Sequence, residues 1–174
     1  MGGNVLKRKP SRMTGDEFME TYGGIYEKSP WIAEAAFERH DIDTVDELHA
    51  AMKTAVNKAD MNQQLALVRA HPDLAIAPAQ MSNLTKESQS EQAGAGLKNC
   101  TPEEFEEFKR LNAEYKEKFG FPFIVAVKGL TRQDILNQFR QRMNSTREQE
   151  FKTALEQIHK IAWHRLTALA TDLV

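Results

Sequence analysis

The 174-residue chain has a single cysteine, Cys100, and no long apolar run. One cysteine cannot close an intramolecular disulfide, and no CxxC pair offers a metal site. No stretch approaches the roughly 20 apolar residues that cross a bilayer, and the N-terminus lacks the apolar centre of a secretory signal. The C-terminal TDLV is not a peroxisomal address of the S-K-L kind. These features predict a soluble, cytoplasmic protein that does not bind membranes.

The chain also lacks an excess of one charge, because 23 Lys and Arg face 25 Asp and Glu, for a net charge of −2. This balance offers no basic footprint for nucleic acid. The one run of like charge, residues 7–9, is interpreted either as part of a solvated tail or as a functional basic arm. We predict a flexible tail over residues 1–12 and one domain over residues 13–174, long enough to bury a core.

Helix-capping patterns recur along the chain and account for most of its local signals. In these patterns a Ser, Thr or Asp precedes an acid or amide by three residues, or a proline follows the cap directly. The expected capping residues are Thr14, Ser29, Thr44, Asp60, Thr85, Thr101, Thr131 and Ser145. About eight helix starts predict an all-α, single-domain bundle.

Two segments extend this prediction. In the helix expected after Thr101, one face carries Phe105, Phe108, Asn112, Tyr115 and Phe119. The following run FPFIVAV, residues 121–127, is rich in β-forming residues and is bounded by Gly120 and Gly129. Because one strand cannot form a sheet, we expect a buried extended segment between helices.

The stretch RAHPDLAIAP places His71 where a helical pattern ends, one residue before Pro72. Proline pushes the preceding residue out of the α region, so His71 leaves the helix on a bent backbone. This arrangement fits an ordinary helix end and fits a catalytic imidazole equally well. The residues alone leave both interpretations open.

The stretch TKESQSEQAGAGL, residues 85–97, places Ser88, Glu91 and Gln92 on one helical face. Gly94 and Gly96 follow, and two glycines indicate either close packing or a flexing backbone. One interpretation is a compact polar lining for a small substrate. The other is a solvent-exposed face on a helix that ends at Gly94.

Arg165 and the remaining histidines leave further alternatives. Arg165 lies at the edge of an apolar stripe, where its guanidinium either reaches out to water or holds a carboxylate. His49, His159 and His164 are expected on helix surfaces, and no metal-ligand spacing is present, so no metal site is predicted. Cys100, just before a helix cap, is interpreted as an inert thiol or as a reactive one of low pKa.

Four motifs occur in one order: HPDLA, LTKESQSEQAGAGL, LNAEYKEKFGFPFIVAVKG and FKTALEQIHKIAWHRL. Together they resemble the 2-oxo-4-hydroxy-4-carboxy-5-ureidoimidazoline (OHCU) decarboxylase family over about residues 13–173. These carboxy-lyases of urate breakdown need no cofactor. The resemblance implies an all-α homodimer whose small-molecule substrate is OHCU.

The resemblance also implies roles for individual residues. His71 matches the catalytic imidazole and Glu91 its acidic partner. The residues implied to bind substrate are Pro72, Ser88, Gln92, Phe123, Ile124, Val125, Ala126, Val127 and Arg165.

The chemistry of OHCU agrees with a protein that carries no cofactor motif. Its carboxylate and hydroxyl share a ring carbon beside a C=N bond, which accepts the electrons released by decarboxylation, so no metal or organic cofactor is needed. His71 is expected to move the proton, giving (S)-allantoin and CO2. Two alternatives stay open: a non-catalytic module whose apolar groove binds a partner helix, and a decarboxylase of another ring substrate.

Overall fold

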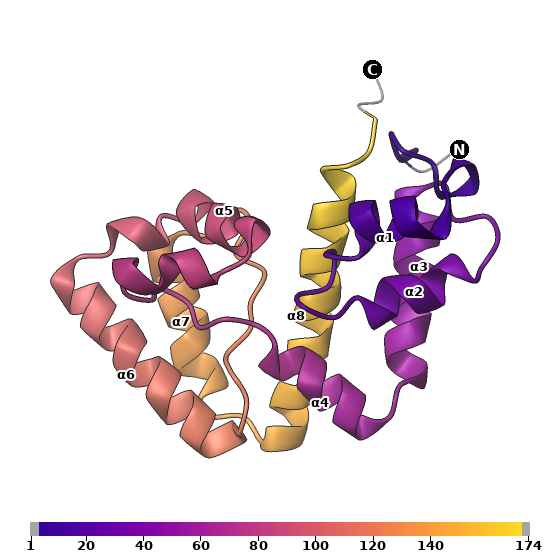
Figure 1. Ribbon diagram of the computed structural model, residues 1–174. Coiled ribbons are helices and arrows are strands. Elements are labelled where there is room, and N and C mark those ends of the chain that lie inside the picture. The colour runs from indigo at the N-terminus through magenta and orange to yellow at the C-terminus, as the bar shows by residue number, and fades with distance from the viewer. Residues whose placement is uncertain (1–3, 172–174) are drawn as a thin grey trace. The chain divides into compact units, whose positions relative to one another are not determined.

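The computed structural model describes residues 4–171 (Figure 1). In this part of the chain the regular elements are α1 (Gly15–Tyr22), α2 (Trp31–Phe37), α3 (Val45–Lys58), α4 (Met61–Arg69), α5 (Lys86–Gly94), α6 (Pro102–Phe119), α7 (Arg132–Arg142) and α8 (Arg147–Thr167), with 3-10 turns η1 (Pro10–Arg12), η2 (Pro78–Asn83) and η3 (Leu97–Asn99). The described residues form no strand beyond isolated bridges. The predicted all-α fold of about eight helices is confirmed.

Most helices begin where the capping patterns predict. At six helix starts the capping side chain accepts a hydrogen bond from the N–H three residues later, at Thr14, Thr44, Asp60, Thr85, Thr101 and Thr131. The prediction at Ser145 was wrong by one residue, because Thr146 accepts the Gln149 N–H at 3.2 Å. Ser29 does not cap α2; its hydroxyl donates to the Glu27 carbonyl at 2.9 Å.

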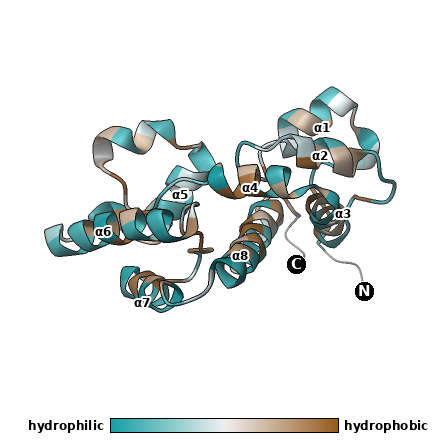
Figure 2. Ribbon diagram, turned by 90° about the horizontal axis from the view of Figure 1, so that it is seen from below, coloured by the Kyte–Doolittle hydropathy of each residue, from teal (hydrophilic) through white to brown (hydrophobic). Residues whose placement is uncertain are grey.

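The chain divides into two compact units, and each has its own buried core. The first unit comprises Met1–Ala70 and His159–Val174, and the second comprises His71–Ile158. The division falls inside α8, so the two ends of this one helix belong to different units. The helices are amphipathic, and Figure 2 shows hydrophobic and hydrophilic residues interspersed along them.

In the first unit, helices α1, α2 and α3 enclose a core that includes Phe18, Ile32 and Leu48, each fully buried. Residues 4–12 join this unit, because Leu6 is 1% exposed and its N–H donates to the Asp43 carbonyl at 2.9 Å. The flexible tail over residues 1–12 stays a prediction, and residues 1–3 of it lie outside the described part of the chain.

In the second unit an aromatic cluster joins α6, α7 and the extended segment 121–127. Every residue of that segment is buried, as predicted. Phe123 stacks on Phe139 of α7, with ring centroids 3.9 Å apart and planes 8° from parallel. Tyr115 of α6 meets Phe123 edge-on at 5.5 Å. The segment is thus held by ring packing instead of by a sheet.

Within residues 4–171, no helix combines the length and the apolar character that crossing a bilayer requires.

Candidate functional site

His71 lies directly after the end of α4, as the His-Pro pair predicts. The Ala70 N–H donates to the carbonyls of Ala66 and Leu67, which closes the helix before the chain turns away. His71 is 8% exposed, so its imidazole is largely withdrawn from water. A buried histidine at a bend between helices is a suitable position for a proton carrier.

The loop after His71 is fastened to α5 by Gln92, which is 2% exposed. The Gln92 Oε1 atom accepts the Ala75 N–H at 3.1 Å, and its Nε2 donates to the Asp73 carbonyl at 3.1 Å. Ala75 has a φ of 55°, in the left-handed region that costs a residue with a Cβ about 1 kcal/mol. Gln92 therefore stabilises a backbone conformation that the loop would not favour by itself.

Helix α6 fastens the same loop from another side. Asn112 donates its Nδ2 to the Leu74 carbonyl at 2.9 Å, and Lys116 forms an ion pair with Asp73 at 2.6 Å. The Oδ1 atom of Asn112 is buried and has no hydrogen-bond partner within the described residues. Asn112 was visible in the sequence as a polar residue on an otherwise aromatic face, although no role could be assigned to it there.

The polar face of α5 is buried at two of its three predicted positions. Ser88 is 4% exposed and Gln92 is deeper still, whereas Glu91 is half-buried. The interpretation of this face as solvent-exposed was therefore wrong for Ser88 and Gln92, although α5 does end at Gly94. A buried hydroxyl and amide one turn apart give the second unit a compact polar surface.

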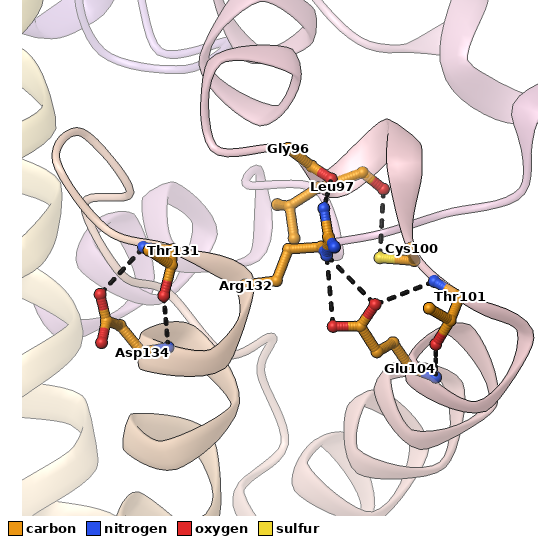
Figure 3. Close-up of polar contacts among 8 residues, drawn as sticks. All are labelled: Gly96, Leu97, Cys100, Thr101, Glu104, Thr131, Arg132 and Asp134. Carbon is orange, nitrogen blue, oxygen red and sulfur yellow. Dashed lines mark hydrogen bonds and ion pairs between the residues drawn. The ribbon is translucent and has the colours of Figure 1, made fainter.

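The two glycines after this face differ in their surroundings. A Cβ on Gly94 would meet nothing within 4 Å, whereas Gly96 has a φ of 77° and faces Arg132. Arg132 donates to the Gly96 carbonyl at 3.2 Å and to both oxygens of Glu104 at 3.1 and 3.2 Å, as Figure 3 shows. Hydrogen bonding from the Thr101 backbone, and then Arg132, lowers the pKa of Glu104.

Cys100 belongs to the same group of contacts. Its thiol donates to the Leu97 carbonyl at 3.3 Å (Figure 3). Burial, and then the charge of Glu104, raises the pKa of this thiol, so it stays protonated at neutral pH. The interpretation of Cys100 as a reactive thiol of low pKa is not supported.

The extended segment Phe123–Val127 is held through its backbone at several points. The Ala126 N–H donates to Gln157 at 2.9 Å, and the Ile124 carbonyl accepts from Arg142 at 2.6 Å. Val125 is 4% exposed, and no hydrogen bond to its N–H or C=O is formed by any residue of the range 4–171. Buried backbone groups require partners, and none of the described residues supplies one to the N–H or C=O of Val125.

Arg165 lies in the first unit, where its side chain is only 6% exposed. Its Nη2 is 2.9 Å from Glu27 Oε2, and its Nη1 donates to the Ile25 carbonyl at 3.3 Å. The snorkelling interpretation was therefore wrong, because the guanidinium is buried and paired. Glu27, 1% exposed, was missed, since nothing local marks an acid in an irregular stretch as buried.

Two histidines of the first unit also differ from the prediction of surface positions. The Tyr26 hydroxyl lies 2.7 Å from His159 Nδ1, and His49 Nε2 donates to the His159 carbonyl at 2.8 Å. Burial, and then the neighbouring His49, lowers the pKa of His159 to about 4. His159 is therefore neutral at pH 7, and burial also raises the pKa of the Tyr26 hydroxyl, so both groups of this contact are uncharged.

Among the described residues, no three side chains of His, Cys, Asp or Glu gather where a metal ion could bind. Of the predicted site residues, the second unit contains His71, Pro72, Ser88, Glu91, Gln92 and Phe123–Val127. Gln92 joins the loop after His71 to the polar face of α5. Three further residues were not predicted: Asn112 and Lys116 hold the loop after His71, and Arg142 holds the extended segment at Ile124.

Comparison with known proteins identifies what this arrangement is similar to. The pattern of the family described as OHCU decarboxylase matches residues 11–167. A 2-oxo-4-hydroxy-4-carboxy-5-ureidoimidazoline decarboxylase of Haloferax volcanii is 42% identical over 156 residues, covering 90% of each chain. One of Halalkalicoccus jeotgali is 40% identical over 154 residues, covering 88% of this chain and 85% of its own.

A solved structure shares both the fold of this chain and more than a third of its sequence. The crystal structure of an (S)-allantoin synthase is 37% identical, with a TM-score of 0.73 over 92% of this chain. The alignment covers 52% of that protein, so the present chain spans about half the length of that solved protein.

Proposed function

The chain belongs to the OHCU decarboxylase family, and from this premise we propose that it decarboxylates OHCU to (S)-allantoin and CO2 in urate breakdown. The observation that carries the proposal is the locked bend at His71. The imidazole is buried at a helix end, and the next residues are tied by Gln92 to a buried polar helix face. A rigid support of this kind holds a proton carrier in one orientation.

The reaction requires little beyond positioning and proton transfer. Loss of CO2 sends the electron pair of the carbon–carboxylate bond into the adjacent ring C=N group, so the substrate accepts its own electrons. The residues therefore need to move the proton of the ring hydroxyl to a single face of the adjacent carbon, while the ring nitrogen that receives the electron pair takes up one proton from solvent. His71, when neutral, withdraws the hydroxyl proton as the electrons shift.

Glu91 is proposed to orient His71 and the hydroxyl, and its charge favours departure of the anionic carboxylate. Ser88 and Gln92 are proposed to contact the substrate from the same helix. Gln92 retains one N–H and one lone pair after its two loop bonds, so it can hold the loop and the ligand together. Pro72 would shape the pocket wall beside His71.

The backbone of Phe123–Val127 is proposed to bind the ring. The OHCU ring presents N–H and C=O groups, and Val125 has one buried donor and one buried acceptor with matching chemistry. Backbone groups in a segment fixed by aromatic packing do not reorganise on binding, which supports tight recognition of a small polar ring.

Arg165 is proposed, on the family resemblance, to bind ring or ureido oxygens. A guanidinium clamped to the leaving carboxylate would stabilise the ground state more than the transition state and oppose the reaction. Glu27 lies 2.9 Å from Arg165 and offsets its charge. That pairing supports a contact to neutral oxygens.

We also propose a cytoplasmic homodimer that works without a cofactor. Both the location and the assembly come from the family resemblance and from the sequence composition. Sedimentation equilibrium of the full chain tests the assembly, where a dimer mass is expected and a monomer mass at high protein concentration would contradict it.

The function is tested by producing OHCU in the cuvette, through enzymatic oxidation of urate and hydrolysis of the product. Circular dichroism then follows optically active allantoin as it accumulates with and without this chain. We expect rapid formation of the (S) enantiomer with the protein present. A racemic product at the uncatalysed rate would instead favour an interaction module, and turnover of a different carboxylated ring alone would indicate another decarboxylase.

A further inference from the structure

Arg142 and Glu150 form an ion pair inside the second unit. Arg142 Nε lies 2.8 Å from Glu150 Oε1, and the two side chains are only 13% and 2% exposed. The Tyr115 hydroxyl donates to the same Oε1 at 2.5 Å. Burial, and then the bond to Glu150, raises the pKa of Tyr115 well above its ordinary value, so the hydroxyl keeps its proton.

The guanidinium of Arg142 also reaches the extended segment. Its Nη1 donates to the Ile124 carbonyl at 2.6 Å, and its Cζ lies 4.3 Å from the centroid of the Phe123 ring. Phe123 is packed against Phe139 in addition. One cation therefore fixes both the backbone of Ile124 and the side chain of Phe123, immediately before Val125.

Stability alone does not explain a buried ion pair at this position. Taking two charges out of water costs so much that apolar residues of similar volume often stabilise a protein equally well. The same helix shows the ordinary alternative, because Arg140 pairs with Glu107 near the surface, where the side chains are 44% and 24% exposed. What the buried pair adds is a fixed orientation of the Arg142 side chain. Its planar guanidinium donates to Glu150 and to the Ile124 carbonyl at the same time.

We propose that Arg142, oriented by Glu150 and Tyr115, is a positioning residue that sets the backbone of Phe123–Val127 for substrate binding. The inference rests on the proposed function, in which this backbone binds the ring. Arg142 itself does not contact the substrate in this proposal. Its effect is to hold the Val125 N–H and C=O in the one arrangement that matches neighbouring amide groups of a cyclic ureide.

The test compares Arg142→Met, Arg142→Lys and the double variant Arg142→Met/Glu150→Met, with Arg140→Met as the control on the same helix. For Arg142→Met we expect KM for OHCU to rise about tenfold or more, since a bond from a charged donor is lost. We expect kcat to change much less, and the amide protons of residues 123–127 to exchange faster. Arg140→Met should leave KM, kcat and the amide exchange of residues 123–127 unchanged.

The double variant separates positioning from stability. Removing both charges should return the thermal midpoint towards that of the wild type, while KM stays raised because the bond to Ile124 is still absent. Arg142→Lys keeps a charge for Glu150 but lacks the second directed donor, so it should fold and still show a raised KM.

Two outcomes would overturn the inference. KM and amide exchange that stay at wild-type values in Arg142→Lys and Arg142→Met would remove the positioning role. Recovery of KM together with the thermal midpoint in the double variant would show that Arg142 acts only on stability. An inactive wild-type protein would instead refute the proposed function, which distinguishes the two failures.

Discussion

Gln92 and Ala75, seventeen residues apart, are joined by a hydrogen bond from the Ala75 N–H to the Gln92 Oε1 at 3.1 Å. Ala75 is 5% exposed and has a left-handed backbone conformation. The bond therefore satisfies a buried donor at a point where the backbone is also strained. Since this loop follows His71, the geometry of the candidate catalytic imidazole depends on a side chain from another helix.

Replacing Gln92 with Met should destabilise the protein by about 2 kcal/mol, because the variant leaves the buried Ala75 N–H and the Asp73 carbonyl without this partner. Urea unfolding measures the effect. Gln89→Met on the same helix is the matched control, because Gln89 makes one bond, to the Leu84 carbonyl, and should cost about 1 kcal/mol or less. Equal losses in the two variants would contradict the special role of Gln92.

Replacing His71 with Asn should lower kcat for OHCU decarboxylation by about 10²–10⁴-fold, the usual contribution of a general acid–base group. The helical circular dichroism should be unchanged, because the turn depends on Pro72 and on the bonds of Gln92. His40→Asn, at an exposed histidine, should keep full activity. Undiminished formation of (S)-allantoin by the His71 variant would refute the assignment.

Alanine substitutions at Gly96 and Gly94 should have opposite effects. Gly96→Ala places a Cβ on a backbone with a φ of 77°, with Arg132 Nη1 3.1 Å away, and should cost about 1–2 kcal/mol. Gly94→Ala meets nothing within 4 Å at the end of α5 and should stabilise the protein by up to about 0.5–1 kcal/mol. Thermal unfolding distinguishes them, and two changes of the same sign would contradict the structure.

His159 should make the stability depend on pH. The pKa of His159 is about 4 in the folded protein, whereas the ordinary value of 6.5 applies in the unfolded chain. Between these two pH values the unfolded chain therefore binds the proton more readily than the folded protein does. Stability should be complete above about pH 6.5 and fall by on the order of 2 kcal/mol as the pH drops towards 4, with allowance for partial exposure.

The measurement is urea unfolding at pH 7, 5.5 and 4.5. His159→Gln should flatten this dependence, because an amide at that position does not titrate, and exposed His40→Gln should leave it unchanged. A slope that survives in the His159 variant would assign the effect to other groups.

Local signals predicted much of the secondary structure. Six helix starts lie at the expected caps, because each cap is a hydrogen bond between residues three apart and needs no tertiary partner. The one-residue error at Ser145 arose where Ser145 and Thr146 both fit the pattern. The end of α4 before His71 followed from the steric effect of Pro72.

Part of the candidate site was also predictable. Residues 71–92 carry a recognisable motif. The burial of Ser88 and Gln92 favours the interpretation of a polar lining over that of a solvent-exposed helix face, which spacing alone could not decide. Arg142, Glu150 and Asn112 could not be assigned, because a charged or amide residue on an amphipathic helix has the same local pattern whether it contacts water or a buried carbonyl.

The sequence by itself determined where most of the helices begin, where the chain bends at His71, and to which family the motifs point. The tertiary structure alone decided which polar groups meet in the interior. Arg165 and Glu27 are 138 residues apart, and Arg142 and Ile124 are 18 apart. Such pairs form only when packing removes both partners from water, since in the unfolded chain each is hydrated separately and nothing local selects its partner.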